Sequence, residues 1–352
     1  MVAKKPKLER IQWETKLHGI KNTIQQSRTT RPNPLVAGEF VFASICSPGA
    51  VCAAKRETGE ILWMRPLDSF GADSVFLHGR NFYATSTRTL YALDPNTGRV
   101  RWQFSPASDP GEWIYSSPSA GAGRVFLGDR CGYFHCLDAK TGSKLWRRLS
   151  SKGDNNQVNS TALVTRERVV SANNEGAVVC YSSETGRTLW RQKVVGACTR
   201  ELLRFRSNVI VAANSLYAID LKTGMIRNQW SFPLKTVKSV AVVGSRIALI
   251  LGTGFQAQPS AWYEASAFDG DLVILEGGRE TSRLKLNGTP SLLASTEDGW
   301  LYTVTHSEVN VFDASNASPL RTRQGEFAQA AISGHHLYGL TVDGVLFCEP
   351  VL

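Results

Sequence analysis

The sequence predicts an all-β fold, a single β-propeller in which four-stranded blades form a ring. Three observations predict it. A nine-residue motif recurs at the spacing of one blade, short alternating strands surround the copies, and a lone strand near the start of the chain matches the end of the motif. A ring of repeats can hold all 352 residues in one domain, because every unit buries its faces against its neighbours.

The motif has the form Asp-x-x-Thr-Gly-x-x-x-Trp, with variation at its first position. Its Thr-Gly pairs begin at residues 58, 97, 141, 185 and 223, so successive copies lie 39, 44, 44 and 38 residues apart. That is the length of a four-stranded blade. In the fifth copy the Trp comes two residues late, at Trp230. The structural residues of the repeat are Gly59, Gly98, Gly142, Gly186, Gly224, Trp63, Trp102, Trp146 and Trp190.

Each part of the motif has a mechanical explanation. The strand before it alternates, as in Leu90–Leu93, the Asp or Thr side chain satisfies turn amides, and the Gly takes a positive φ before the chain extends again. The motif is therefore the hairpin between the third and fourth strands of a blade. Two earlier strands can be recognised upstream of it, for example at 117–120 and 124–128. The Trp on the outer strand is expected to fill the wedge between adjacent blades.

The later copies are weaker. Ala267–Asp269 and Val311–Asp313 keep the strand end and the Asp but lose Thr-Gly and Trp, and they are interpreted as blades six and seven. Phe327–Leu352 then provides only three strands. The count is eight blades if blade six is one unit, and seven otherwise.

The missing strand is found at the other end of the chain. Ile11–Leu17 matches the outer strand Ile61–Leu67, with Trp13 at the position of Trp63, and it has no hairpin before it. We expect this N-terminal strand to complete the last blade, which removes an exposed sheet edge and couples the two termini.

These assignments predict the boundaries along the chain. Residues 1–7 form a basic flexible tail and residues 8–352 form the propeller. Its closing strand is 8–17, and its blades are 33–66, 73–104, 117–149, 158–194, 200–232, 238–286, 289–322 and 326–352.

The pattern resembles the repeat of pyrroloquinoline-quinone (PQQ) dehydrogenases and of quinone-free propellers that share it, the outer-membrane assembly lipoprotein type more than the dehydrogenases. The resemblance spans about Trp13 to Leu352. For the dehydrogenases it implies a vicinal Cys-Cys disulfide against the quinone, a calcium ion and an Asp base. This sequence has no adjacent cysteines and is shorter than those enzymes. We therefore expect no cofactor, and PQQ with calcium is disfavoured.

The cysteines and histidines favour packing over metal binding. Cys136, Cys180 and Cys348 each lie four residues after a Gly, and in the repeat they align with alanines. Equivalent positions of a ring are one blade apart, so these thiols cannot share a metal ion. His335 and His336 are adjacent in a predicted strand and should point to opposite faces. The aligned alanines are Ala53, Ala92, Ala218 and Ala267.

The net charge of +10 lies mostly at the start of the chain. Residues 1–31 hold eight Lys or Arg against two Glu, which gives +6 and leaves +4 for the rest. The first ten residues are basic with no apolar run behind them, no lipobox-like cysteine follows, and no apolar stretch is long enough to span a membrane. We expect a cytoplasmic, monomeric ring without a membrane partner.

The candidate functional residues lie in the loops that connect one blade to the next, which all emerge on one face. Ser105–Pro118 contains an aromatic pair and Ser151–Ser160 is rich in amides, which suits recognition of a protein or a glycan. The alternative is that the aromatic pair plugs the tunnel or covers a blade. The excursion Gly252–Ser266 is either a binding insert or repeat decay. The residues are Trp113, Tyr115, Asn155, Asn156, Asn159, Arg200, Lys238 and Trp262; for the two cations the alternative is solvated surface.

No catalytic, metal-binding or cofactor-binding residue stands out. The sequence shows no Ser/His/Asp grouping, phosphate loop or paired-carboxylate motif. The leading hypothesis is a non-enzymatic platform that binds protein partners through the blade-to-blade loops. The alternative is a quinone- or small-ligand-dependent enzyme with its site at the tunnel mouth. Nucleic-acid binding by the basic N-terminal arm is weaker, because no aromatic residue precedes Trp13 in the arm.

Overall fold

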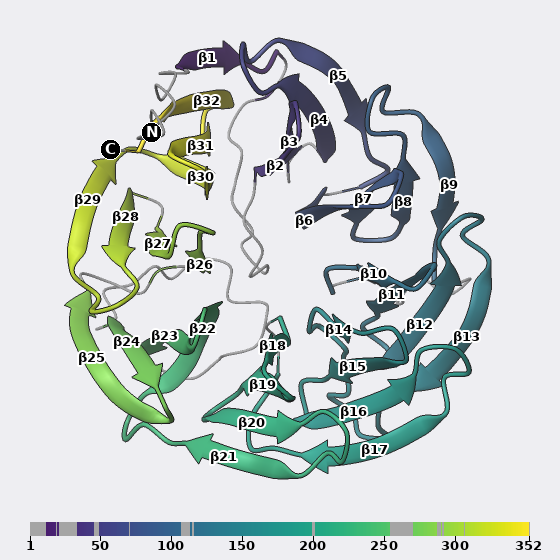
Figure 1. Ribbon diagram of the computed structural model, residues 1–352. Helices are drawn as coiled ribbons and strands as arrows, with labels where there is room; N and C mark the ends of the chain where they lie inside the picture. The colour runs from purple at the N-terminus through teal and green to yellow at the C-terminus, as the bar shows by residue number, and fades with distance from the viewer. Residues whose placement is uncertain are drawn as a thin grey trace, which may run out of the picture.

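A computed structural model of the chain describes residues 12–18, 20, 34–45, 49–69, 71–106, 113–114, 116–198, 201–253, 270–286, 290, 292–305 and 307–351. The described residues form eight antiparallel four-stranded sheets, arranged as a ring (Figure 1). The predicted all-β propeller is confirmed, and the count is eight blades, not seven. The part of the chain described here contains no helix that is long and apolar enough to cross a membrane.

The first four blades run from the innermost to the outermost strand in chain order. Blade one has β2 (Leu35–Ala37), β3 (Phe40–Ile45), β4 (Ala50–Lys55) and β5 (Ile61–Pro66); blade two has β6 (Gly71–His78), β7 (Asn81–Ser86), β8 (Leu90–Leu93) and β9 (Val100–Phe104); blade three has β10 (Ser119–Gly121), β11 (Arg124–Gly128), β12 (Tyr133–Asp138) and β13 (Lys144–Leu149); blade four has β14 (Leu163–Val164), β15 (Arg168–Ala172), β16 (Ala177–Ser182) and β17 (Thr188–Lys193).

The last four blades follow the same plan. Blade five has β18 (Leu203–Phe205), β19 (Asn208–Ala212), β20 (Leu216–Asp220) and β21 (Ile226–Trp230); blade six has β22 (Thr236–Val243), β23 (Arg246–Gly252), β24 (Gly270–Glu276) and β25 (Arg279–Leu286); blade seven has β26 (Leu292–Ser295), β27 (Trp300–Val304), β28 (Glu308–Asp313) and β29 (Pro319–Gln324); blade eight has β30 (Phe327–Ser333), β31 (His336–Thr341), β32 (Val345–Pro350) and β1 (Trp13–Lys16).

The ring closes as the sequence predicts. The N-terminal β1 pairs antiparallel with β32, with Trp13 opposite Cys348 and Lys16 opposite Val345. Figure 1 shows β1 at the outer edge of the blade that holds the last three strands of the chain. Because blade eight is built from both ends of the chain, this blade cannot come apart without separating strands distant in sequence, and its outer edge is paired.

The repeat hairpins have the predicted chemistry. In blade two the carboxylate of Asp94 accepts hydrogen bonds from the amides of Asn96 and Thr97 at 2.9 and 3.1 Å, and Gly98 has φ +66°. The copy at Val311–Asp313 also forms this hairpin although its Thr-Gly is lost. There Ala317 takes the glycine's place with φ +61° and donates its amide to Asp313 O at 2.9 Å.

Blade six departs from the predicted frame. Ala267–Asp269 lies outside the described residues, and the third strand of this blade begins only after it, at Gly270. The hairpin that follows is Gly277-Gly278, with φ +59° and +85°. The position that the sequence frame gave to Ala267 belongs to Ile274, which pairs with Ser282 as Cys136 pairs with Trp146. The frame failed because this blade uses a two-glycine turn in place of the Asp-x-x-Thr-Gly turn.

The tryptophans close the wedges between blades, as predicted. The indole of Trp146 donates Nε1–H to Ser183 O of the next blade at 3.2 Å. It also covers Gly186, where a Cβ would come within 2.6 Å of the ring. The same two contacts join Trp13, Trp63, Trp102 and Trp190 to carbonyls of Arg56, Pro95, Ala139 and Leu221 and to Gly59, Gly98, Gly142 and Gly224.

A small side chain faces each of these indoles across the third and fourth strands. Cys136 pairs with Trp146 and Cys180 with Trp190, and Ala53 and Ala92 hold the same position opposite their own tryptophans. Burial raises the pKa of the Cys136 thiol to about 12. These cysteines are therefore buried packing residues that stay protonated at neutral pH.

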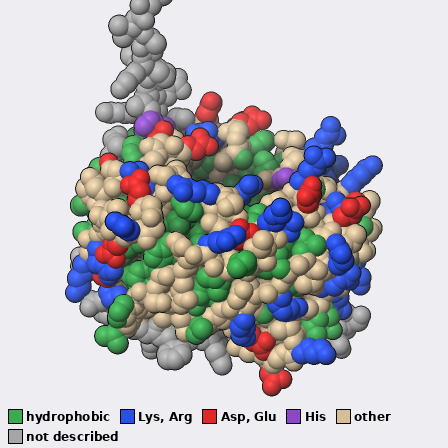
Figure 2. All heavy atoms as spheres, turned by 60° about the horizontal axis from the view of Figure 1, so that its bottom comes forward, with side chains coloured by type: hydrophobic (Ala, Val, Ile, Leu, Met, Phe, Trp, Pro, Cys, Tyr) green, Lys and Arg blue, Asp and Glu red, His purple; other side chains and the backbone are tan. Residues whose placement is uncertain are grey.

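The outer wall of the ring carries many Lys and Arg side chains with acidic residues among them (Figure 2). Several of these cations bond within the ring. Arg148 donates to the Gly186 and Thr185 carbonyls, and Arg101 pairs with Asp94 at 2.6 Å. The near-balanced charge expected for the ring therefore combines a basic wall with acidic residues that neutralise parts of it.

Candidate functional site

The strand order defines two faces of the ring. The first-to-second turns of all eight blades and the third-to-fourth turns of blades one to seven lie on one face, which we call the hairpin face. The second-to-third turns and the blade-to-blade connections lie on the other, which we call the loop face. Of the predicted interaction residues that the structure describes, Lys238 lies within β22 and the others lie in segments of the loop face, namely Trp113, Asn155, Asn156 and Asn159.

Backbone hydrogen bonds fix the loop face from blade two to blade five. Ile114 N donates to Thr87 O of blade two at 2.8 Å, while Arg130 N of blade three donates back to Trp113 O at 2.9 Å. The same exchange recurs at the next two connections, in the pairs Val158 N to Asp129 O, Asn174 N to Gln157 O, Cys198 N to Asn173 O and Asn214 N to Val195 O, at 3.0 to 3.2 Å. Each connection is therefore tied to both blades that it joins.

Trp113 is half-buried among these hydrogen-bonded loops. Its ring lies under the Arg130 guanidinium, 5.4 Å from Cζ to the ring centroid, and the next residue, Ile114, is buried between blades two and three. Trp113 thus covers the side of blade three, which matches one half of the alternative stated from sequence. Tyr115 lies outside the described residues.

The three predicted asparagines have different surroundings. Asn155 is exposed. Asn156 donates its amide to Ser151 O at 3.0 Å and packs over Gly132, and Asn159, which is buried, donates to Asn174 Oδ1 at 3.3 Å. Asn156 and Asn159 therefore hold the loop in shape, whereas Asn155 is exposed, with its Oδ1 accepting a hydrogen bond from Asn174 Nδ2 at 3.5 Å.

The remaining predicted residues add little to the site. Arg200 and Trp262 lie outside the described residues, and Lys238 is half-buried at a register shift of β22. Next to it, Lys235 and Arg283 both contact the buried Asp271, at 2.8 and 2.6 Å. Burial by itself raises the pKa of Asp271, but the hydrogen bonds from Lys235 and Arg283 outweigh it and lower that pKa. This cluster anchors the connection between blades five and six.

Sequence reasoning missed two apolar residues on neighbouring connections of the loop face. Val195 is 67% exposed, and Leu234 is 96% exposed with φ +60°. A left-handed backbone costs a non-glycine residue about 1–2 kcal/mol. The only signal in the sequence is the Phe-Pro-Leu run at 232–234, which stands between two blade assignments.

Sequence reasoning also missed a buried hydrogen-bonded pair, His135 and Asp129, at the turn between β11 and β12. His135 Nε2 lies 2.7 Å from Asp129 Oδ2, and both side chains are fully buried. The second Asp129 oxygen accepts the amide of Tyr133 at 2.9 Å, the role that Asn173 has in blade four toward Ala177. The pair therefore shapes the turn that receives two blade-to-blade connections.

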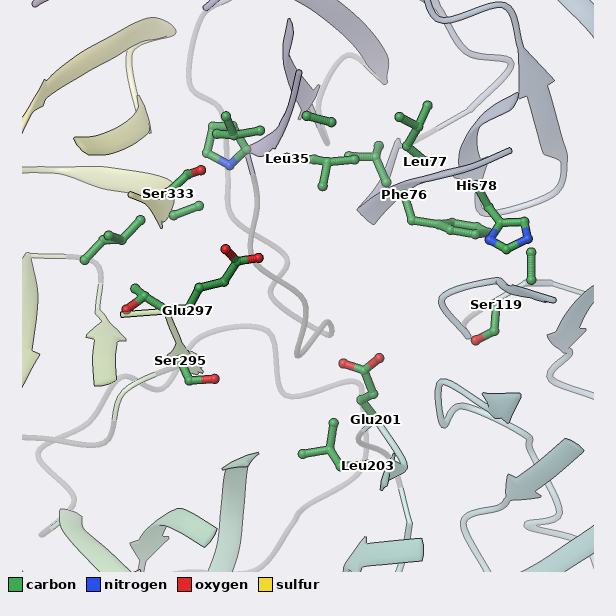
Figure 3. Close-up of a pocket in the computed structure, with 18 of the residues that line it drawn as sticks. Leu35, Phe76, Leu77, His78, Ser119, Glu201, Leu203, Ser295, Glu297 and Ser333 are labelled. Carbon is green, nitrogen blue, oxygen red and sulfur yellow. The ribbon is translucent and has the colours of Figure 1, made fainter. Parts of the chain in front are cut away.

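The centre of the ring holds a cavity of about 980 Å³ lined by the innermost strands. Figure 3 shows the carboxylates of Glu201 and Glu297 pointing into it from blades five and seven, with Leu35, Phe76 and Leu203 around them. Two acidic groups among apolar walls can bind a small cationic or amide-bearing group.

The residues around the cavity do not fit the quinone and calcium of the dehydrogenases. Among the described residues, no three His, Cys, Asp or Glu side chains are grouped so that they could hold a metal ion. Adjacent cysteines do not occur in the sequence. That the chain binds no quinone stays a prediction, which a melting titration with the quinone and calcium tests, because a ligand of the folded state raises the melting temperature.

Comparison with known proteins identifies sequence relatives of the chain. A family model described as outer membrane protein assembly factor BamB matches residues 6–232. The BamB of Legionella pneumophila (strain Paris) is 25% identical over 103 residues, which are 29% of this chain and 26% of that protein. The chain therefore matches about a quarter of that relative's length.

Solved structures show the same ring. BamB from Moraxella catarrhalis aligns with a TM-score of 0.57 at 19% identity, covering 88% of this chain and 79% of that one. The quinohemoprotein alcohol dehydrogenase ADHIIG of Pseudomonas putida HK5 aligns with 0.73 at 11% identity, over 97% and 76%. The computationally designed Ika8 protein gives 0.73 at 15%, over 94% and 100%. At these identities the likeness shows the fold alone, whereas the family match over residues 6–232 shows that the chain belongs to the BamB-like family of PQQ-repeat propellers.

Proposed function

We propose that the chain is a non-enzymatic platform that binds protein partners on its loop face, across blades three to six. The observation that carries the proposal is the pair of exposed apolar tips, Val195 and Leu234, on neighbouring connections. Both tips project from a ring whose loops are fixed by backbone bonds at Val195 and by the Lys235–Asp271 contact beside Leu234. A preorganised apolar tip loses little entropy on binding, which favours affinity.

Other residues of the same face complete the proposed interface. Asn155 is exposed on the connection before Val195, and the half-buried Trp113 lies on the connection before that. Arg130, in the turn between β11 and β12, is exposed and lies over the Trp113 ring. Apolar anchors surrounded by amide and Arg groups are typical of protein interfaces. The family's description as an assembly factor supports a role in bringing proteins together. Cytoplasmic location stays a prediction, which fractionation of cells that produce a tagged chain tests.

Affinity capture with matched variants tests the proposal. Val195→Asp combined with Leu234→Asp places two charges on the proposed interface, so recovery of partners should fall at least about tenfold, or about 1.4 kcal/mol. Met225→Asp is the control. Met225 is 58% exposed and belongs to blade five, which lies between the connections of Val195 and Leu234, but it is on the hairpin face. Equal recovery by all three proteins would contradict the proposal.

A glycine variant separates binding from folding. Leu234→Gly removes the apolar tip but suits φ +60° better than leucine. We expect this variant to unfold at a slightly higher temperature than the wild type and still to lose the partner. Loss of binding in a stabilised protein cannot be ascribed to misfolding.

A further inference from the structure

The junction between blades five and six lacks its repeat tryptophan. In the outer strand β21 the position that pairs with Ala218 is Asn228, whereas in blade four the corresponding position opposite Cys180 is Trp190. Trp190 is buried, and Asn228 is exposed. Trp230, two residues further along, donates its Nε1–H to Gly278 O of blade six at 2.8 Å and packs, half-buried, against the apolar cluster between blades five and six.

The missing indole leaves a pocket of about 200 Å³ that opens on the hairpin face. Its walls include Ala218 of blade five, Ile247 and Leu275 of blade six, and the edge of Trp230. A Cβ on Gly278 would meet nothing closer than Asn228 Nδ2 at 3.5 Å, whereas on Gly224 it would meet the Trp190 ring at 2.7 Å. The glycine surface that an indole covers at the neighbouring junction is therefore uncovered here.

The size of the pocket suits one aromatic ring system. An engineered cavity of about 150 Å³ in another protein binds benzene, so about 200 Å³ can take the larger indole. Arg206 and Arg227 also line the pocket, and the Arg206 guanidinium lies over the Phe205 ring, 5.2 Å from Cζ to the ring centroid. Cations beside an aromatic face attract it. Arg227 is held in place by Asp220 at 3.0 Å.

One residue of the pocket wall has a side-chain oxygen that is not paired with any described residue. Asn208 lines the pocket, and the Asn208 side-chain oxygen is buried with no hydrogen-bond partner in the described part of the chain. Buried acceptors are normally paired. At the five junctions with a repeat Trp, the indole N–H donates to an acceptor of the next blade at 2.9 to 3.2 Å.

We propose that this pocket binds the side chain of a tryptophan presented by a protein partner, which takes the place of the missing repeat Trp. The proposal rests on the proposed function only in that the chain binds proteins, since the pocket lies on the opposite face from Val195 and Leu234. The ring packs between Ala218 and Leu275, and its N–H donates to Asn208 Oδ1 after this buried amide turns toward the pocket.

The test uses a capped Gly-Gly-Trp-Gly-Gly peptide that carries 5-fluorotryptophan, observed by fluorine NMR. The wild type should broaden and shift the signal. Asn228→Trp supplies an internal indole, so affinity should fall at least about tenfold because a close-packed wedge has no room for two rings. Asn228→Ser is the matched control and should bind as the wild type does. Equal binding by the wild type and Asn228→Trp, or no binding to the wild type at millimolar peptide, overturns the proposal.

A second variant tests the hydrogen bond without filling the pocket. Asn208→Leu removes the acceptor, so it should weaken the tryptophan peptide severalfold but leave a 1-methyltryptophan peptide unchanged. Equal loss for both peptides overturns the assigned bond. Free 5-fluoroindole is the third probe: if it binds and the peptide does not, the occupant is a small molecule and the protein-partner proposal is wrong. Capture by the Val195 and Leu234 variants reports the loop-face function independently.

Discussion

The ring has two kinds of junction between its blades. From blade eight through blade one to blade five, each junction is closed by an indole that packs on a glycine and bonds to a carbonyl of the next blade. At the other three junctions the position of the indole holds Asn228, Ser282 and Arg321. We call these the Trp junctions and the substituted junctions.

The substituted junctions rely on polar and charged contacts. Arg321 donates to Pro350 O at 2.9 Å, Arg323 contacts Glu349 at 2.9 Å, and Lys235 and Arg283 converge on Asp271. Exposed ion pairs contribute about 0–1 kcal/mol each, whereas burying an aromatic side chain contributes about 1.5–3 kcal/mol. The comparison teaches that a lost indole contact and a candidate binding pocket coincide at one substituted junction, between blades five and six, where Asn228 holds the position of the indole and a pocket of about 200 Å³ is open.

The largest expected effect comes from the strand that joins the two regions. Deleting residues 1–17 removes β1 and Trp13, which leaves β32 as a bare edge and opens the junction between blades eight and one. We expect loss of more than about 5 kcal/mol or aggregation, measured by thermal melting and size-exclusion chromatography. Deletion of residues 1–7 is the control and should leave the midpoint unchanged. A wild-type midpoint for the longer deletion would show that the ring does not depend on this closure.

A pair of tryptophan substitutions compares the two kinds of junction directly. Trp146→Ala removes a buried ring and should cost about 3–5 kcal/mol of unfolding free energy. Trp230→Ala removes a half-exposed ring that leaves one bond to Gly278 O unmade, and should cost about 1–2 kcal/mol. Denaturant titration measures both. Equal costs would mean that the substituted junction is packed as firmly as the others.

A set of glycine substitutions isolates the contact with the indole. Gly142, Gly278 and Gly79 all have positive φ, at +74°, +85° and +60°. A Cβ would lie 2.6 Å from Trp102 at Gly142, 3.5 Å from Asn228 at Gly278, and nothing lies within 4 Å at Gly79. Each Gly→Ala change costs about 1–2 kcal/mol for the backbone, and only Gly142→Ala adds about 1–3 kcal/mol of overpacking. If the midpoints of all three variants fall by the same amount, the Trp102 indole moves aside for the added Cβ at no cost in free energy.

The fold was predictable because the residues that build it act locally. Asp94 and Gly98 form the hairpin of blade two through contacts between residues at most five positions apart. Trp63 is likewise placed locally, by the outer strand that follows the hairpin of blade one. The sequence-based prediction places the third strand of blade six at the wrong residues, because this blade turns at Gly277-Gly278 and not at an Asp-x-x-Thr-Gly motif. The Phe-Asp pair at 268–269 has the sequence of a strand end and is predicted as one. Even there the number of strands was correct, since the ring cannot close without them.

The candidate site was predictable only in part, because exposure depends on the loop conformation. Asn155, Asn156 and Asn159 look alike in the sequence, but only backbone contacts decide that Asn156 covers Gly132 and that Asn155 stays exposed. Leu234 is an ordinary loop leucine until its φ and its 96% exposure are known. The substitution of Asn228 for the repeat Trp was visible, but its consequence, a pocket, requires the positions of both blades.

The smallest expected effect concerns the charged contacts of the substituted junctions. The pKa of Asp271 is lowered in the fold, because the hydrogen bonds from Lys235 and Arg283 outweigh the effect of burial. Its folded pKa therefore lies below the unfolded value of about 3.9. The carboxylate stabilises the fold above that pH, and this contribution is lost as the pH falls through the folded pKa.

Asp271→Asn should therefore cost about 1–3 kcal/mol at about pH 7, and the gap to the wild type should narrow below about pH 4. Thermal melts of both proteins across this range measure the gap. Asp271→Asn combined with Lys235→Met is the control, because removing both charges leaves no buried cation without a partner and should cost less than the single change. If the stability difference between the two proteins stays constant down to about pH 3, Asp271 titrates alike in the folded and unfolded chains. The junction between blades five and six is then held by packing, as the Trp junctions are.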